Sequence, residues 1–501
     1  MKQIIISLLF GSSLAAQVIP YDFPSEFPTS QAYTASIAGT AVPALQTKRG
    51  AFLSFGMTGP VEVKVKLAKA PQSVFVRPLS AGIKAEINGD TFRFQLPRPM
   101  NLSVEIDGGL DDPLFVFANP KLDSPDRKDP KLKYYEAGKI HDAGEILLGD
   151  GETLYLEGGA VVRGEVRGRN GRNVSVRGAG ILDAGARKHK INMLVLRECR
   201  DSVVENIILL DPLGWTMHLS ACENIRVANT RVIGWRANSD GLDIEHSSKV
   251  RVDGCFWRTN DDCIAIKAVY PPGVKGVPFE EMINPETIGG HDVPRVEGGA
   301  MEDIDIRNCV LWNDAGGQGF EIGFELRVDA IRGIIFRDSD IIRVIGGGAF
   351  TIHNGDRAKI ENILIENIRV ENTDRLVDFH VGLSIYSHDC PPDFRRTNPK
   401  RKAPPKENLP ARANNPYQWY VPADDDLPKY ENHRGHVRDV IFRDVTVSTA
   451  PQTNSFLIGY SDTRGISDVT FQNLVIEGRP IRSAAGADLF IKHARRVRFV
   501  P

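Results

Sequence analysis

The feature that most constrains the fold is a short phrase that recurs through the second half of the chain. In each copy an apolar, a variable and a second apolar residue precede a polar turn residue, and a second alternating run follows. The copies lie at Asn224–Val232, Lys249–Phe256, Asp303–Val310, Gly333–Asp340, Asn362–Ile368, Asp439–Val445 and Asp468–Leu474. Two or three short strands with turns between them form one coil of a parallel β-helix.

The spacing of the copies supports this interpretation. The apolar positions 203, 225 and 250 are separated by 22 and 25 residues, and 304, 334 and 363 by 30 and 29. Periods of 20 to 50 residues indicate stacked units. An array of leucine-rich repeats is the alternative, but its Leu-x-x-Leu-x-Leu phrase and its helical half are missing. The sequence therefore predicts an all-β protein in which residues 132–501 form a right-handed parallel β-helix.

A different pattern precedes the repeat. Polar and apolar residues alternate with period two in Val61–Leu67 and Thr91–Leu96, and turn signals such as Asn88-Gly89-Asp90 separate these runs. We expect a small N-terminal β-sandwich over residues 17–119 and a linker over residues 120–131, which are rich in Asp and Pro.

The first sixteen residues have the pattern of a secretory signal peptide. Lys2 precedes the apolar run Ile4–Phe10, and the small residues Ser13–Ala16 form a cleavage site. The alternative is a buried first strand. The run is too short to cross a bilayer, and no later segment has the apolar length of a membrane helix. The pattern predicts a secreted or periplasmic protein without a membrane span.

Charge and cysteine content exclude some classes of function. The 62 basic and 64 acidic residues give a net charge of −2, so nothing favours a nucleic-acid partner. No cysteine pair has CxxC spacing, and five of the six recur inside strand-like segments, which favours core fillers over metal ligands or disulfides. These are Cys199, Cys222, Cys255, Cys263 and Cys309.

Two stretches interrupt the repeat, at about residues 268–300 and 385–435. Long loops on a rigid scaffold commonly shape a binding cleft. The second stretch contains a basic run at residues 395–402, which is either a solvated loop or a site for an anionic glycan.

Three aspartates are the candidate catalytic residues. Asp240 precedes Asp261 by 21 residues, about one coil, and Asp262 follows directly. Adjacent rungs lie about 4.8 Å apart, so the carboxylates repel one another and at least one pKa should rise. Glycoside hydrolysis needs a carboxylic acid and a carboxylate in this arrangement. An Asn/Asp ladder at the turns, as expected for Asn224 and Asp253, and a calcium site are the alternatives.

The chain resembles glycoside hydrolase family 28, the polygalacturonases, in three segments and their spacing: Asp211–His218, Asn238–Gly241 and Asp261–Lys267. The likeness spans roughly residues 135 to 480. It implies an inverting hydrolase on a right-handed parallel β-helix, with Asp261 as the general acid and Asp240 and Asp262 activating water. It implies a polysaccharide substrate and no cofactor or metal.

The chain departs from that family at two places. The family's Gly-His-Gly stretch is replaced by Gly317-Gln318-Gly319, and its Arg-x-Lys pair, which holds the substrate carboxylate, is absent from residues 346–353. The chain is similar to family 49, the dextranases and isopullulanases, in its front β-domain and in the Glu-x-Gly phrase at Glu321–Gly323. We therefore expect a member of this clan whose substrate is a neutral or differently charged polysaccharide.

Four further residues are candidates for the substrate site. Trp215 and His218 would line sugar subsites, Lys267 would tune the aspartates by its charge, and Glu321 would face the cleft. Trp215 is equally compatible with a core position, and Lys267 with a capped turn. Trp312 is a further aromatic candidate.

Two other classes of function compete with hydrolysis: a polysaccharide lyase, which needs a cationic base and usually calcium, and a non-catalytic glycan-binding β-helix. For an inverting hydrolase, the acid and base carboxylates should lie roughly 6.5–9.5 Å apart.

Overall fold

The computed structural model describes residues 17–188, 190–269, 299–384, 386–390, 419–420 and 427–501. The predicted signal peptide, the basic run and the greater part of both predicted loops lie outside these residues. Within them, no helix has the length and apolar character needed to cross a membrane.

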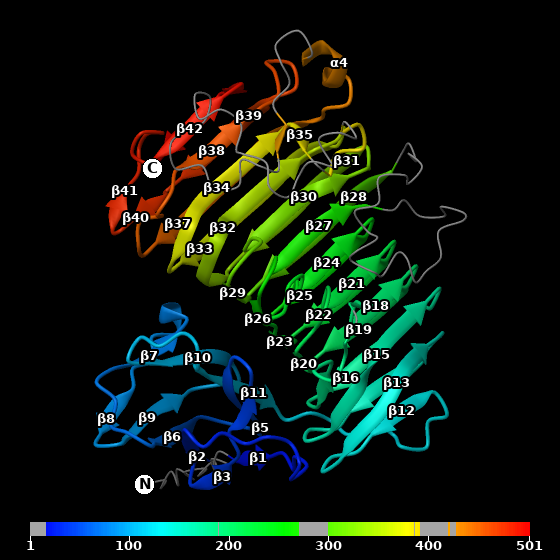
Figure 1. Ribbon diagram of the computed structural model, residues 1–501, viewed down its shortest axis with the longest axis vertical. Coiled ribbons are helices and arrows are strands. Elements are labelled where there is room, and N and C mark those ends of the chain that lie inside the picture. The colour runs from blue at the N-terminus through cyan, green and yellow to red at the C-terminus, as the bar shows by residue number, and fades with distance from the viewer. Residues whose placement is uncertain (1–16, 189, 270–298, 385, 391–418, 421–426) are drawn as a thin grey trace, which may run out of the picture.

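The N-terminal part is a sandwich of two sheets that enclose one apolar core (Figure 1). The first sheet contains β1 (Val18–Pro20), β4 (Leu45–Thr47), β5 (Gly50–Met57), β7 (Val74–Arg77), β10 (Asn101–Ile106) and β11 (Leu114–Pro120). The second contains β2 (Tyr33–Ile37), β3 (Thr40–Val42), β6 (Val61–Leu67), β8 (Glu86–Asn88) and β9 (Thr91–Leu96). Period-two alternation buries every second residue of β6, as expected for a strand with one face on a core. The predicted sandwich is confirmed.

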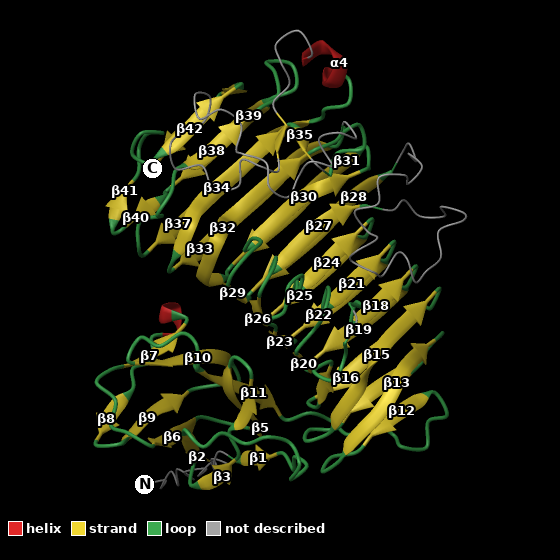
Figure 2. Cartoon of the chain, viewed as in Figure 1, coloured by secondary structure: helices red, strands yellow, loops and turns green. Residues whose placement is uncertain are grey.

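The rest of the chain winds into a parallel β-helix, seen in Figure 2 as a long row of strands. Its coils form three stacks of parallel strands. The site stack contains β18 (Leu194–Arg197), β21 (Met217–Ser220), β24 (Leu242–Glu245), β27 (Ile264–Ala268), β30 (Phe320–Leu326), the end of β32 (Asp340–Asn354), β34 (Thr373–Val381), β38 (Ser455–Ile458) and β42 (Leu489–Lys492).

The outer stack contains the phrases that recur in the sequence. Its strands are β12 (Leu132–Tyr135), β14 (Thr153–Leu156), β16 (Ser175–Gly178), β19 (Arg200–Glu205), β22 (Glu223–Ala228), β25 (Ser248–Asp253), β28 (Ala300–Arg307), β31 (Ala330–Arg337), β33 (Lys359–Val370), β37 (His436–Val447), β39 (Ile466–Gln472), β43 (Ala494–Arg495) and β44 (Arg498–Val500). The register keeps like residues above one another: Val250, Ile304, Ile334, Ile363 and Val440 form one continuous apolar row. The predicted right-handed parallel β-helix is confirmed.

The interface stack faces the sandwich. It contains β13 (Ile140–Leu148), β15 (Val161–Arg169), β17 (Ile181–Asp183), β20 (Ile208–Leu210), β23 (Arg231–Ile233), β26 (Phe256–Thr259), β29 (Val310–Asn313), the start of β32, β40 (Val475–Ile476) and β41 (Arg479–Pro480). The remaining elements are the short 3₁₀ turn η1 (Leu79–Ala81), the pair β35 (Leu383–Ser384) and β36 (Trp419–Tyr420), and the helix α4 (Leu427–Glu431).

An aromatic cluster joins the two parts. Phe115 of the sandwich lies edge-on to Phe256 and Trp312 of the interface stack, with ring centroids 5.6 and 6.2 Å apart. Trp312 is therefore part of a buried interface, and its candidacy as a sugar-binding residue is wrong because its side chain is 0% exposed and packs against the sandwich. The five cysteines predicted as core fillers are buried free thiols.

Candidate active site

The three predicted aspartates converge at the turns that lead into the site stack. Leu242 lies opposite Ile264, and the Gly241 N–H donates to the Asp262 carbonyl at 2.8 Å, so Asp240 and Asp262 are neighbours on adjacent rungs. One carboxylate oxygen from each of Asp240, Asp261 and Asp262 lies within 4.8 Å of the others. They lie together because the 21 residues between Asp240 and Asp261 make up about one coil.

This distance contradicts one expectation. The predicted separation of the acid and base carboxylates, roughly 6.5–9.5 Å, is wrong for the nearest oxygens. The reason is the parallel register, which places Asp240 directly beside Asp262 on adjacent rungs. By the general rule of about 5–5.5 Å, the observed spacing is on the retaining side.

Lys267 supplies the positive charge among these carboxylates. Its Nζ lies 3.5 Å from Asp240 Oδ2, 3.7 Å from Asp262 Oδ2 and 3.4 Å from Asp243 Oδ1, and 4.5 Å from the centre of the Trp215 ring. Burial lowers the pKa of Lys267, but the surrounding carboxylates raise it well above its usual value. The side chain thus remains an ammonium group and contacts the aspartates, as the sequence suggested.

The aspartates themselves hold their protons tightly. Burial, together with repulsion from Asp243, raises the pKa of Asp240 well above the ordinary range. Burial likewise raises the pKa of Asp262 strongly and that of Asp261 to a lesser degree, while Lys267 opposes both shifts. Because these groups interact so closely, they titrate as a set and not one by one. Such a set can offer both an acid and a base.

Trp215 and His218 lie on the preceding coil. The two rings meet edge to face with centroids 5.1 Å apart, and both side chains are buried. His218 Nε2 lies 2.7 Å from Glu245 Oε2, and its Nδ1 lies 3.2 Å from the Asn192 amide nitrogen. The structure therefore places both residues next to Lys267 and its carboxylates, on the N-terminal side of the site.

Glu321 lies on the following coil, opposite Ala265, and is also buried. Its Oε1 lies 2.8 Å from His353 Nδ1, and Thr351 donates a hydrogen bond to Oε2. Glu321 thus lies on the outward row of the site stack, and its carboxylate is already bound by two side chains; that it faces a substrate cleft stays a prediction.

The departure from the family's Gly-His-Gly stretch has a visible consequence. The Gln318 N–H donates to Asp262 Oδ1 at 2.8 Å, and the Gln318 side-chain oxygen accepts from the Gly348 N–H at 2.6 Å. A Cβ at Gly317 would lie 2.4 Å from Asp261 Oδ1, so only glycine fits there. This turn fixes the Asp261–Asp262 pair from the next coil.

Sequence reasoning missed several charged residues of the site. They are Asp243, Glu245, His353, Arg375, Asp378 and His380. In-register pairing connects Asp243, Ala265, Glu321, Thr351 and Asp378 in one outward row, and His353 with His380 in another. One signal in the sequence could have found Asp243. It lies two residues before Glu245 on the same strand, and alternate residues of a strand point to the same side. The later ones were hidden because the coils there differ in length.

Among the residues that the structure describes, two groups of side chains have the geometry to hold a cation: the aspartate trio, and His353 with Asp378 and His380. In the first, Lys267 already provides a positive charge. In the second, Arg375 forms an ion pair with Asp378, and His380 Nδ1 lies 2.8 Å from Asp378 Oδ1. Each group thus already contacts a cationic side chain of the protein.

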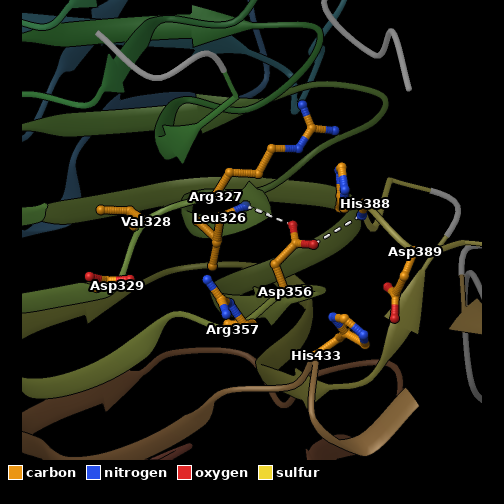
Figure 3. Close-up of a pocket in the computed structure, with 9 residues that line it drawn as sticks. All are labelled: Leu326, Arg327, Val328, Asp329, Asp356, Arg357, His388, Asp389 and His433. Atoms are coloured by element: carbon orange, nitrogen blue, oxygen red, sulfur yellow. Dashed lines mark hydrogen bonds between the residues drawn. The ribbon is translucent and has the colours of Figure 1, made fainter. Parts of the chain in front are cut away.

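A separate small cavity lies past the ends of β30 and β32 (Figure 3). Its lining includes Arg327, Arg357, His388 and His433. Asp356 also lines it, and both of its carboxylate oxygens are occupied, accepting from the Leu326 N–H at 3.3 Å and the His388 N–H at 3.0 Å. None of the predicted site residues lines this cavity.

Comparisons with known proteins agree with the fold and the motifs. Residues 154–293, which contain the three aspartates, match the model of glycosyl hydrolases family 28. A probable polygalacturonase of Arabidopsis thaliana is 28% identical over 125 residues, which cover 25% of this chain and 24% of that protein. The match thus spans about a quarter of this curated relative.

Solved structures extend the likeness to the whole chain. Dex49A from Penicillium minioluteum aligns over 96% of this chain and 97% of its own, with a TM-score of 0.51 and 12% identity, which shows the shared fold. A hyperthermoactive exopolygalacturonase from Thermotoga maritima aligns over 72% and 83% of the two chains, at 14% identity and a TM-score of 0.43. The match to the family 28 model confirms the predicted resemblance to that family and supports a glycosidase, and Dex49A shows the fold that the whole chain shares.

Proposed function

We propose that this protein is a secreted glycosidase that hydrolyses O-glycosidic bonds of a polysaccharide at Asp240, Asp261 and Asp262. The observation that carries the proposal is the convergence of these carboxylates within 4.8 Å on a β-helix whose central coils match family 28. The pattern of residues 1–16 is the basis for secretion.

The proposed reaction needs one proton donor and one base. Asp261 gives its proton to the leaving glycosidic oxygen, while Asp240 and Asp262 take a proton from the water that attacks the anomeric carbon. The C–O bond to the leaving group breaks as the bond to the water oxygen forms. The roles of the three residues follow the family 28 pattern.

A neutral glycan is the favoured substrate class. Three cations described along the outward rows are paired: Lys267 with three aspartates, His353 with Glu321 and Asp378, and Arg375 with Asp378. The described carboxylates of the site outnumber these three cations. A polyuronate would bring further negative charge to these carboxylates, and like charges repel.

Substitution of the proposed acid is the direct test. We expect Asp261→Asn to reduce turnover by about 10²–10⁴-fold while the fold is kept, because the amide cannot transfer the proton. Asp142→Asn is the matched control, since the Asp142 side chain is 79% exposed and remote from the site stack. Unchanged turnover in the Asp261 variant would point to a glycan-binding protein or to other catalytic groups.

Substrate and reaction type are tested together. Reducing ends should appear with dextran or pullulan rather than with polygalacturonate, and faster cleavage of polygalacturonate would contradict a neutral substrate. A product that absorbs in the ultraviolet through a new double bond would instead identify a lyase.

Stereochemistry needs its own measurement. We include inversion in the proposal on the family pattern, although the short carboxylate spacing matches the rule for retention. Proton NMR of the first product, recorded before mutarotation, should show the anomer opposite to that of the cleaved bond. The same anomer would establish retention.

A further inference from the structure

A chain of alternating charges lies beside the aspartate trio on the site stack. It runs from Arg375 through Asp378 and His353 to Glu321, and each member contacts the next. These four side chains are all less than 10% exposed. Buried charges are kept only when paired in this way, so the row is a built feature of the fold and not a solvated surface.

His353 is the cation that fixes Glu321. Burial lowers the pKa of His353, but Glu321 and Asp378 raise it to about 10, so the ring is an imidazolium at neutral pH. Asp378 in turn is held ionised, because Arg375 and His380 overcome the effect of burial and keep its pKa well below the usual range. The ring of Phe324 stacks on His353 with centroids 4.3 Å apart and holds it in place.

The Glu-x-Gly phrase gains a physical meaning here. Gly323 has φ +146°, and a Cβ at this position would lie 2.6 Å from Glu321 Oε1 and 2.8 Å from the Cβ of His353. Any larger residue would therefore separate the carboxylate from the imidazolium. The glycine two residues after Glu321 creates the space in which the ion pair forms.

Glu321 lies on the coil that follows the Asp261–Asp262 pair. Ala265, three residues after Asp262, is its in-register neighbour on β27, and the Ala265 side chain carries no charge. The groups that surround the pair are Asp240 and Asp243 from the preceding coil, Lys267 from the same coil, and Gln318 and Glu321 from the following coil. The Glu321 charge raises the pKa of both aspartates.

We propose that Glu321 is a positioning residue for the hydrolysis described above: its carboxylate, held in place by His353 and Thr351, acts through its charge on the Asp261–Asp262 pair and favours the protonated acid. The inference rests on the proposed function for its role in catalysis. It assigns Glu321 a different task from the sugar contact that the sequence suggested, because both carboxylate oxygens are already bound by protein side chains.

The pH profile of kcat/KM of the full chain tests this role. Glu321→Gln removes the negative charge and keeps the shape of the side chain. Without that charge the acid loses its proton more easily, so the alkaline limb should move to lower pH by about one unit. At pH values on that limb, kcat/KM of the variant should be about tenfold lower than that of the wild-type protein, whereas kcat/KM on the acidic side should be largely retained. Glu321→Asp keeps the charge and should leave the limb within a few tenths of a unit.

Two results would overturn the inference. One is an unmoved limb with uniformly lower activity, which would indicate a contact with substrate or a packing role. The other is complete loss of activity at every pH in a folded variant, which would make Glu321 a reacting group. If Glu321→Gln fails to fold, Glu321→Met removes the same charge without burying an amide.

A measurement without substrate separates this inference from the proposed function. Infrared titration of protonated carboxyl groups should show the Asp261–Asp262 protons lost at lower pH in Glu321→Gln than in the wild-type protein. This shift is expected even if the wild-type protein cleaves none of the glycans tested. Identical titrations would refute the role of Glu321 while leaving hydrolysis, as tested by Asp261→Asn, untouched.

Discussion

Asp243 is the most deeply enclosed carboxyl group of the site. It is 0% exposed, and its ion-pair partner Lys267 is shared with Asp240 and Asp262. Burial raises the pKa of Asp243 to about 7, although Lys267 and His218 oppose the shift. The folded protein thus holds a proton that the unfolded chain releases at about pH 3.9.

This linkage predicts how stability depends on pH. Because the folded-state pKa is the higher one, the contribution of Asp243 is fully present below about pH 3.9 and is lost as the pH rises through about 7. Asp243→Asn removes this proton, so the variant should lose less thermal stability between pH 5 and pH 8 than the wild-type protein. Calorimetry at both pH values measures the difference.

Asp142→Asn serves as the control for that experiment and should follow the wild-type protein, because the Asp142 side chain is 79% exposed in the folded protein. An equal loss of stability in Asp243→Asn and the wild-type protein would show that Asp243 is ionised throughout this range.

At the scale of single elements, the turns between the strands of the β-helix depend on Asn and Asp side chains. Many of these residues adopt positive φ, and their side chains bond to the coil above or below. Asn224 donates to Asp201 at 2.6 Å, and Asn308 donates to Asp253 at 2.7 Å. The Asn/Asp ladder expected for Asn224 and Asp253 is confirmed. Asn and Asp are favoured because they tolerate the left-handed conformation.

The ladder makes a prediction for Asn367, which has φ 51° and donates to Asp338 Oδ1 at 2.7 Å. Asn367→Ala should lower the free energy of unfolding by about 1–2 kcal/mol, because alanine is strained in this conformation and cannot form the bond. Asn367→Gly should cost less, since glycine adopts positive φ freely. Urea denaturation of both variants measures this order, and an alanine variant as stable as the glycine variant would contradict it.

The two parts of the molecule are joined by buried aromatic rings and by polar contacts. Arg231 donates to Asn101 Oδ1 at 2.8 Å, and Arg77 bridges Glu105 of the sandwich and Glu371 of the β-helix. An interface of this kind, which is apolar at its centre and carries polar contacts at its rim, couples the stability of the parts it joins.

Phe115 therefore contributes to the stability of both parts. Phe115→Ala should lower the free energy of unfolding by about 3–5 kcal/mol, because it leaves a cavity between Phe256 and Trp312. Phe75→Ala on the same sandwich is the matched control: this ring is 45% exposed, and its loss should change stability by about 0.5 kcal/mol or less. Thermal unfolding of the two variants is the measurement, and equal effects would contradict the role of Phe115.

The sequence by itself determined the repeating architecture and the grouping of the three candidate aspartates. The period of the apolar phrase predicts parallel stacking, since each coil can bury its apolar face only against the next, and a separation of one coil places Asp240 beside Asp261 and Asp262. These are properties of spacing along the chain, which survive whatever loops are inserted elsewhere.

Only the tertiary structure decided which other residues complete the site. Coils of unequal length separate Glu321 from His353 and Asp378, so their alignment with Asp243 and Lys267 follows from strand register and not from sequence spacing. The distance between the aspartate carboxylates likewise follows from the spacing of adjacent rungs and could not be derived from the stereochemistry that the family resemblance implies. Protonation depends on burial and on charges brought from several coils, and a linear sequence does not contain those distances.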